Sequence, residues 1–161
     1  VALGLAAGAY RNALAFSKER EQFGRPIAEF QGLQWMLADM SVQLEAARAL
    51  LHKAALSAGH NGSPFPDATL AAQGKIFTSE MALKVTTDAL QVFGARGYSR
   101  NYPMERLARD ARMFTIGGGT AQILRTVVVS RILGSKLPQT RDGFSKLAES
   151  ASARTILQAA E

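Results

Sequence analysis

A single run of apolar residues in the middle of this chain constrains its fold more than any other feature. Between residues 30 and 54 the run steps alternately by three and four: Phe30, Leu33, Leu37, Met40, Leu44, Ala47, Leu51 and Ala54. This spacing places all of them on one face of an α-helix and is typical of helices that pack nearly antiparallel in a bundle. The run therefore predicts a long helix that requires helical neighbours.

Helical spacing also predicts a neighbour on the N-terminal side of this run. One apolar face there consists of Leu3, Ala7, Tyr10 and Leu14. Gly24 is expected to stop this helix, and Pro26 prevents its simple continuation. On the other side, residues 57–67 are rich in turn-forming residues and predict a loop.

Three more helices are expected in the C-terminal half, and no segment shows a convincing strand pattern. Asp67 is a candidate cap for a helix whose face consists of Leu70, Gly74, Phe77, Met81, Val85, Ala89 and Val92. After a connection at residues 93–103, Pro103 is expected to open a short helix that extends to Ala111. Thr120 is expected to cap a last helix up to residue 132, which Gly134 and Pro138 close.

Together these helices define the expected architecture. A chain of 161 residues favours one domain. We predict an all-α fold, an antiparallel four-helix bundle over residues 1–138. The polar, alanine-rich tail at residues 139–161 is expected to form a loose helix or to remain disordered.

Composition narrows the classes of function. The absence of cysteine excludes disulfides, thiolate metal sites and a cysteine nucleophile, and it favours a reducing cytoplasm. The net charge is +6, but no run of five like charges occurs, so we expect a solvated basic surface and no nucleic-acid partner. No apolar segment is long enough to predict a membrane span.

The two histidines do not indicate a metal centre. His52 lies beside the apolar run and is interpreted as a packed or solvated residue, while His60 lies in the 57–67 loop with no partner signal. No Glu-x-x-His pair faces the core, as a di-iron bundle would require. We therefore expect no metal.

Three stretches of the chain, in order, resemble the C-terminal domain of the acyl-CoA dehydrogenase family of flavoproteins. They are SKEREQFGRPIAEFQGLQWMLADM, DALQVFGARGYSRNYPMERLARDARMF and IGGGTAQILRTVVVSRILG. The resemblance runs from Val1 to about Pro138 and agrees with the four-helix prediction.

The resemblance implies a flavin-dependent function for a larger protein. In this family FAD lies between a middle β domain and the C-terminal bundle, and its adenine-diphosphate end also reaches the bundle of a neighbouring subunit. A carboxylate removes the α-proton of an acyl-CoA thioester while a hydride leaves the β-carbon for the flavin. The implied partners are acyl-CoA, an electron-transfer flavoprotein or similar acceptor, and further subunits in a homotetramer or α2β2 assembly.

The resemblance also assigns cofactor-binding residues by position. They are Arg20, Gln22, Phe23, Gln31, Gln91, Val92, Gly94, Ala95, Thr120 and Gln122. Arg20 matches an arginine that reaches the FAD pyrophosphate of the neighbour, where a guanidinium fork suits a pair of phosphates. Without the motif, Arg20 could equally be a solvated helix-end residue, and the Gly94 region is also compatible with a simple helix C-cap turn.

The glycine triplet at residues 117–119 is where the sequence departs from the family. Many relatives have tyrosine, glutamate and glycine before the threonine, and the glutamate is the catalytic base. When the sequences are aligned on Thr120, Gly118 occupies the position of the base and cannot accept a proton. A phosphate-binding P-loop is excluded because no lysine follows the glycines. No residue of this chain is therefore predicted to be catalytic.

Two hypotheses follow from the missing carboxylate. The base of an acyl-CoA dehydrogenase could lie upstream of Val1, as the resemblance implies for some branches of the family, and the isolated chain would then be inactive. Alternatively, the chain belongs to a non-catalytic partner subunit that completes the FAD site of another subunit.

Overall fold

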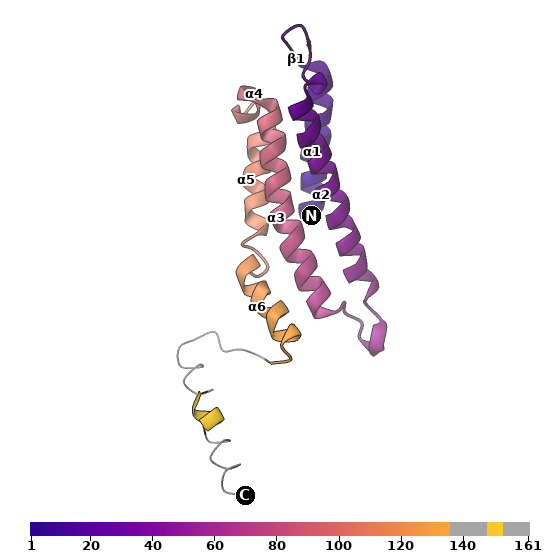
Figure 1. Ribbon diagram of the computed structural model, residues 1–161, viewed down its shortest axis with the longest axis vertical. Coiled ribbons are helices and arrows are strands. Elements are labelled where there is room, and N and C mark those ends of the chain that lie inside the picture. The colour runs from indigo at the N-terminus through magenta and orange to yellow at the C-terminus, as the bar shows by residue number, and fades with distance from the viewer. Residues whose placement is uncertain (136–147, 153–161) are drawn as a thin grey trace, which may run out of the picture.

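The helices of the computed structural model stand side by side in an elongated bundle (Figure 1). The structure describes residues 1–135 and 148–152. The elements in chain order are α1 (Ala2–Glu19), β1 (Glu21–Gln22), β2 (Arg25–Pro26), η1 (Ile27–Glu29), α2 (Gln31–Leu56), η2 (His60–Gly62), α3 (Ala68–Phe93), α4 (Ala95–Tyr98), α5 (Met104–Phe114) and α6 (Ala121–Ile132).

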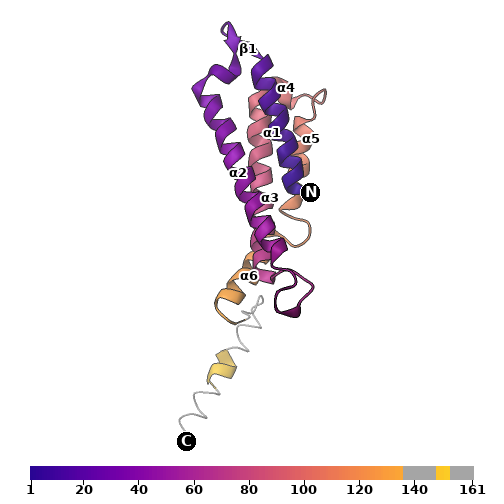
Figure 2. The same cartoon turned by 90° about the vertical axis from the view of Figure 1, so that its right-hand side faces the viewer.

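The bundle has four columns, and consecutive columns run in opposite directions (Figures 1 and 2). Three columns are the helices α1, α2 and α3. The fourth consists of α5 and α6 placed end to end along α3, with a break at residues 115–120 that contains the glycine triplet. The prediction of an all-α antiparallel four-helix bundle is therefore confirmed, with a fourth member that is divided in two.

The long apolar run forms the core-facing side of α2, as predicted. Its most buried members are Leu37, Met40, Leu44, Ala47 and Ala54. The cap predictions are also confirmed, since the Asp67 carboxylate accepts a hydrogen bond from Leu70 N–H at 2.8 Å. The Thr120 hydroxyl accepts one from Ile123 N–H at 3.2 Å. Capping of this kind stabilises a helix by about 1 kcal/mol.

α3 is the central helix, because it packs against α1, α2, α5 and α6. The predicted face is buried at Met81, Val85 and Ala89. Further buried residues lie outside that face, namely Ala72, Thr78, Ser79, Ala82, Thr86 and Phe93. The prediction of one buried face was incomplete, because a helix surrounded by four others is covered on more than one side.

The core-facing stripe of α1 differs from the predicted one. Ala6, Ala9, Ala13 and Ser17 are fully buried. The predicted face of Leu3, Ala7, Tyr10 and Leu14 is half-buried and flanks that stripe. The predicted face consists mostly of larger side chains. In the structure, small side chains of α1 lie nearest to the core, and this lets the helix backbones come close to one another.

A short antiparallel hairpin follows α1, although no strand was predicted. Glu21 pairs with Pro26 and Gln22 pairs with Arg25. Gly24 lies in the turn of this hairpin at a φ of +77°, so it does not stop the helix, which already ends at Glu19. Strands of two residues are too short to produce an alternating apolar pattern in the sequence.

Gly134 follows the end of α6 at a positive φ of 66°, as a C-terminal glycine should. Pro138 lies outside the described residues. Most of the predicted tail at 139–161 also lies outside them, and its described part, residues 148–152, is helical. In the part of the chain that the structure describes, no helix has both the length and the apolar character needed to cross a membrane.

Candidate functional site

Half of the predicted cofactor residues come together in one pocket at the hairpin end of the bundle. The pocket has a volume of about 280 Å3, and the predicted residues in its wall are Arg20, Gln22, Val92, Gly94 and Ala95. They come from the end of α1 with its hairpin and from the corner between α3 and α4, which lie at the same end of the molecule (Figure 1). The two segments meet because α1 and α3 pack along each other.

Two backbone hydrogen bonds fix the main chain at Arg20. It ends α1 in an extended conformation, with φ −76° and ψ 122°. Its N–H donates to the Phe16 carbonyl at 2.8 Å, and its own carbonyl accepts from Ile27 N–H at 2.8 Å. Both backbone groups are satisfied, so the half-buried Arg20 has a fixed backbone and a guanidinium available for a ligand.

The opposite wall is the corner between α3 and α4, which depends on two glycines. Gly94 has a φ of +57°, and its N–H donates to the Gln91 carbonyl at 3.0 Å. A Cβ at Gly97 would lie 2.5 Å from the Leu90 carbonyl oxygen, so only glycine fits there. The Phe93 ring stacks on Phe16 with centroids 4.1 Å apart and joins the two walls.

The pocket is positively charged, and none of the described residues in its wall is acidic. Arg96, which sequence reasoning missed, lies in the wall with Arg20, and its guanidinium carbon is 5.8 Å from the centroid of the Phe16 ring. Neither arginine forms an ion pair with any residue that the structure describes. Two unpaired guanidinium groups beside glycine backbone can hold a phosphate-like anion. The sequence signal that could have identified Arg96 is its position as a cationic residue directly after Ala95.

Three predicted residues lie near this end but outside the pocket wall. Phe23 is 93% exposed at the hairpin turn, with a φ of +53°, and its ring contacts Phe30 edge to face at 6.1 Å. Gln31 is exposed at the start of α2, and Gln91 is exposed on α3. The structure thus separates these side chains from the group around Arg20.

Thr120 and Gln122 line a second pocket of about 450 Å3, beside the glycine triplet. The turn before Thr120 is fixed from both sides. Ala121 N–H donates to the Thr115 carbonyl at 3.0 Å, and the Lys75 ammonium donates to the Gly119 carbonyl at 2.5 Å. The break between α5 and α6 is therefore an ordered turn.

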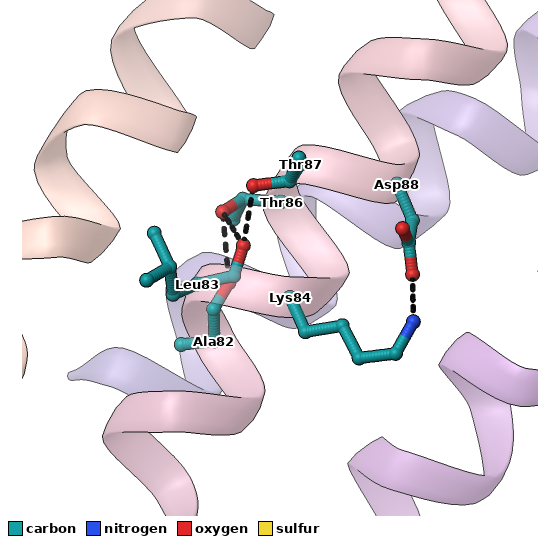
Figure 3. A network of polar contacts seen from close by, with 6 residues as sticks. All are labelled: Ala82, Leu83, Lys84, Thr86, Thr87 and Asp88. Carbon is teal, nitrogen blue, oxygen red and sulfur yellow. Dashed lines mark hydrogen bonds and ion pairs between the residues drawn. The ribbon is translucent and has the colours of Figure 1, made fainter.

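Two acidic residues line this second pocket, and both are paired with cations. The Lys84 ammonium donates to Asp88 Oδ2 at 2.6 Å (Figure 3). This hydrogen bond raises the pKa of Lys84 above its ordinary value of 10.5, although partial burial acts in the opposite direction. Arg125 donates to both oxygens of Glu80, at 2.7 and 2.8 Å. Neither carboxylate is poised to remove a proton.

At two positions of the triplet, Gly118 and Gly119, the backbone favours glycine over any residue with a Cβ. Gly118 has a φ of +67° and Gly119 a φ of +89°, a region that side chains with a Cβ rarely adopt. A glutamate at position 118 would be strained in this turn. Among residues 1–135 and 148–152, no group of three or more histidine, aspartate or glutamate side chains is arranged to hold a metal ion.

This chain is similar in sequence and in structure to several known proteins. A 3-sulfinopropanoyl-CoA desulfinase of Cupriavidus necator is 65% identical over 144 residues, which cover 89% of this chain and 35% of that protein. Butyryl-CoA dehydrogenase from Megasphaera elsdenii is 43% identical with a TM-score of 0.77, over 82% of this chain and 34% of that chain. PigA, solved as an FAD complex, is 28% identical with a TM-score of 0.74, over 83% of this chain and 34% of that chain.

This chain therefore spans about a third of the length of these relatives. Residues 1–133 match the family described as acyl-CoA dehydrogenase, C-terminal domain. The match covers most of the chain, and the solved relatives repeat its helical fold. The chain belongs to the acyl-CoA dehydrogenase family, of which it is the C-terminal helical domain.

Proposed function

We propose that the whole protein is a flavin-dependent acyl-CoA enzyme and that this domain supplies part of its FAD site. This proposal is supported by the chemistry of the hairpin-end pocket. Arg20 and Arg96 form no ion pair within the described part of the chain, and Gly94 leaves the backbone accessible. These groups match the diphosphate of FAD, and Phe16 and Val92 offer apolar surface beside it. When bound, FAD supplies a redox-active ring that this domain does not contain.

We further propose that the reaction is removal of a sulfinate group from 3-sulfinopropanoyl-CoA. The observation that carries this proposal is the turn at Gly118, which has no carboxylate and a backbone suited to glycine. The name of the 65% identical Cupriavidus necator relative supplies the substrate. A dehydrogenation removes the α-proton of the acyl group and requires a base to accept it. The net desulfination removes no α-proton.

The net chemistry of desulfination is consistent with the missing base. The carbon–sulfur bond breaks and leaves its electron pair on carbon, which takes a proton, while the sulfur takes hydroxide from water. The products are propanoyl-CoA and hydrogensulfite, and water supplies all the added atoms. No electrons leave the substrate, so no external electron acceptor is consumed.

The test is to supply the FAD-loaded whole protein with 3-sulfinopropanoyl-CoA in the absence of any electron acceptor. We expect sulfite and propanoyl-CoA in equal amounts, measured by colorimetry and mass spectrometry. Butanoyl-CoA with an artificial acceptor should give no enoyl-CoA. Acceptor-dependent oxidation of butanoyl-CoA without sulfite release would contradict the desulfinase proposal.

α,β-Dehydrogenation of an acyl-CoA is the second candidate, favoured by the 43% identity to butyryl-CoA dehydrogenase. In that case the base comes from another part of the whole protein, and an electron-transfer flavoprotein or similar acceptor takes the electrons. A whole protein that binds FAD but performs neither reaction would instead be a non-catalytic partner subunit. Mass measurement in solution would test the expected homotetramer or α2β2 assembly.

A further inference from the structure

A second basic pocket lies at the end of the bundle opposite the hairpin. Its volume is about 890 Å3, and its wall includes His52 and Lys53 from the end of α2, His60 from η2 and Arg131 from the end of α6. Nothing in the sequence relates the two histidines to each other. The fold brings them into one pocket because the 57–67 loop turns back beside the end of α2.

The positive charge of this pocket is only partly neutralised from within, because two cations, Lys53 and Arg131, stand against one carboxylate, that of Asp67. Lys53 and Arg131 form no ion pair with any residue in the described ranges 1–135 and 148–152. Among the described residues of the wall, Asp67 is the acidic one, and its carboxylate accepts the Leu70 N–H at 2.8 Å as the cap of α3, which orients it toward that helix. The pocket therefore presents an excess of hydrogen-bond donors and positive charge, which suits an anion and not a metal cation.

One side of the same pocket is apolar. Leu56 and Phe65 line it and are 75% and 74% exposed, and Pro66 lies beside them. Exposed aromatic and aliphatic surface of this kind is suited to stacking a planar ring. The volume of about 890 Å3 lies within the range of about 300–1,000 Å3 that is usual for small-molecule sites.

We propose that this pocket binds a phosphorylated nucleotide. Lys53, Arg131 and the two imidazoles hold the phosphate, and the base lies against Phe65. The nucleotide is either the one carried by acyl-CoA or a free nucleotide that acts as an effector. α2 has 26 residues and is thus about 39 Å long, so a nucleotide in this pocket cannot also occupy the pocket at Arg20.

The first experiment is a calorimetric titration of the FAD-loaded whole protein with adenosine 3′,5′-bisphosphate. Saturable binding is expected, and Lys53→Gln and Arg131→Gln should each weaken it about tenfold, as loss of a charge-assisted hydrogen bond does. Arg48→Gln is the matched control, because it removes the same charge from α2 outside this pocket. No saturable binding, or equal weakening by Arg48→Gln, would overturn the proposal.

Two further probes test the two halves of the pocket. Adenosine without phosphate should bind at least tenfold more weakly than the bisphosphate, and Phe65→Ala should weaken the bisphosphate while leaving inorganic phosphate unaffected. Equal affinity for adenosine and its bisphosphate would contradict a phosphate site. Circular dichroism of each variant should remain unchanged, since these side chains are exposed.

The source of the nucleotide is decided by kinetics. If it belongs to acyl-CoA, Lys53→Gln raises KM for the CoA thioester and leaves KM for the corresponding pantetheine thioester unchanged. If it is a free effector, neither KM changes, while bisphosphate binding is still weakened about tenfold. FAD content and sulfite release are measured separately, so failure of this proposal is distinguishable from failure of the proposed function.

Discussion

Gly118 shows how much one residue can change the chemistry open to a domain. The family resemblance predicts a general base at this position, and a glycine cannot supply one. Its φ of +67° also makes the position unsuited to a side chain. The backbone of the turn therefore disfavours a side chain at this position. Gly118→Glu would be strained before it could supply any chemistry.

We predict that Gly118→Ala lowers the free energy of unfolding by about 1–2 kcal/mol, the cost of a left-handed conformation for a residue with a Cβ. No described residue has an atom within 4 Å of the added Cβ, so the loss reports backbone strain. Gly117→Ala is the comparison variant, since its φ is not in that region. Its Cβ would lie 3.0 Å from the Met113 Sδ, which can move, and 3.4 Å from the Met113 carbonyl oxygen, which is an ordinary contact distance. Chemical denaturation measures both variants, and equal losses would contradict the argument.

Two buried threonines on α3 allow a matched test of hydrogen bonding. Thr78 Oγ1 is buried with no hydrogen-bond partner within the described part of the chain, whereas Thr86 Oγ1 donates to the Ala82 carbonyl at 2.8 Å (Figure 3). Thr78→Val should raise the free energy of unfolding by about 1 kcal/mol, and Thr86→Val should lower it by about the same amount. Thermal denaturation is the measurement, and effects of equal sign would refute the distinction.

At the scale of the element, local signals in the sequence identified most helix ends. Asp67 and Thr120 cap the helices that follow them because the side-chain oxygen satisfies an amide that has no partner within the helix. The hairpin was missed because two-residue strands leave no periodic signal. The stripe of α1 was misplaced because its burial depends on alanines that fit against α3, and alanine is weakly informative by itself.

The ion pair on α3 has a defined pH dependence. Its hydrogen bond to Asp88 raises the pKa of Lys84 above 10.5, so the stabilisation is fully present below pH 10.5 and is lost as the pH rises through the raised value. We expect Lys84→Gln to be less stable than the wild type at pH 8 and equal to it once Lys84 has lost its proton. Denaturation curves across this range measure the difference. Lys18→Gln removes an exposed lysine that has no ion pair with any described residue, and it should show no such convergence.

At the scale of the whole molecule, α3 holds the bundle together, whereas α6 packs chiefly on α3. α6 also leaves Ile123, Val129 and Ile132 exposed. We expect amide hydrogens of α3 to exchange slowest in the 161-residue chain and those of α6 much faster, because α6 can open without disturbing the rest of the core. Mass-spectrometric hydrogen exchange measures this order, and equal protection of both helices would contradict it.

The pocket at the hairpin end exists only where α1 and α3 meet, so its test also belongs to the whole molecule. Arg20→Gln and Arg96→Gln should each weaken FAD binding by the whole protein about tenfold, because each removes a charge-assisted contact. Arg100 follows α4 in the chain and does not line the pocket, so Arg100→Gln should leave the affinity for FAD unchanged. Fluorescence titration of the flavin-free protein measures all three, and loss of affinity in Arg100→Gln would refute a specific site.

The sequence by itself determined the helices, their caps and the family, because these depend on spacing and on motifs that are local. It also revealed the absence of a base at residue 118. Only the tertiary structure showed that Arg96 joins Arg20, that the two histidines share a pocket with Arg131, and that α3 is covered on more than one face. Those facts depend on which residues distant in the chain become neighbours. Packing of whole helices decides such neighbours, and no local pattern records them.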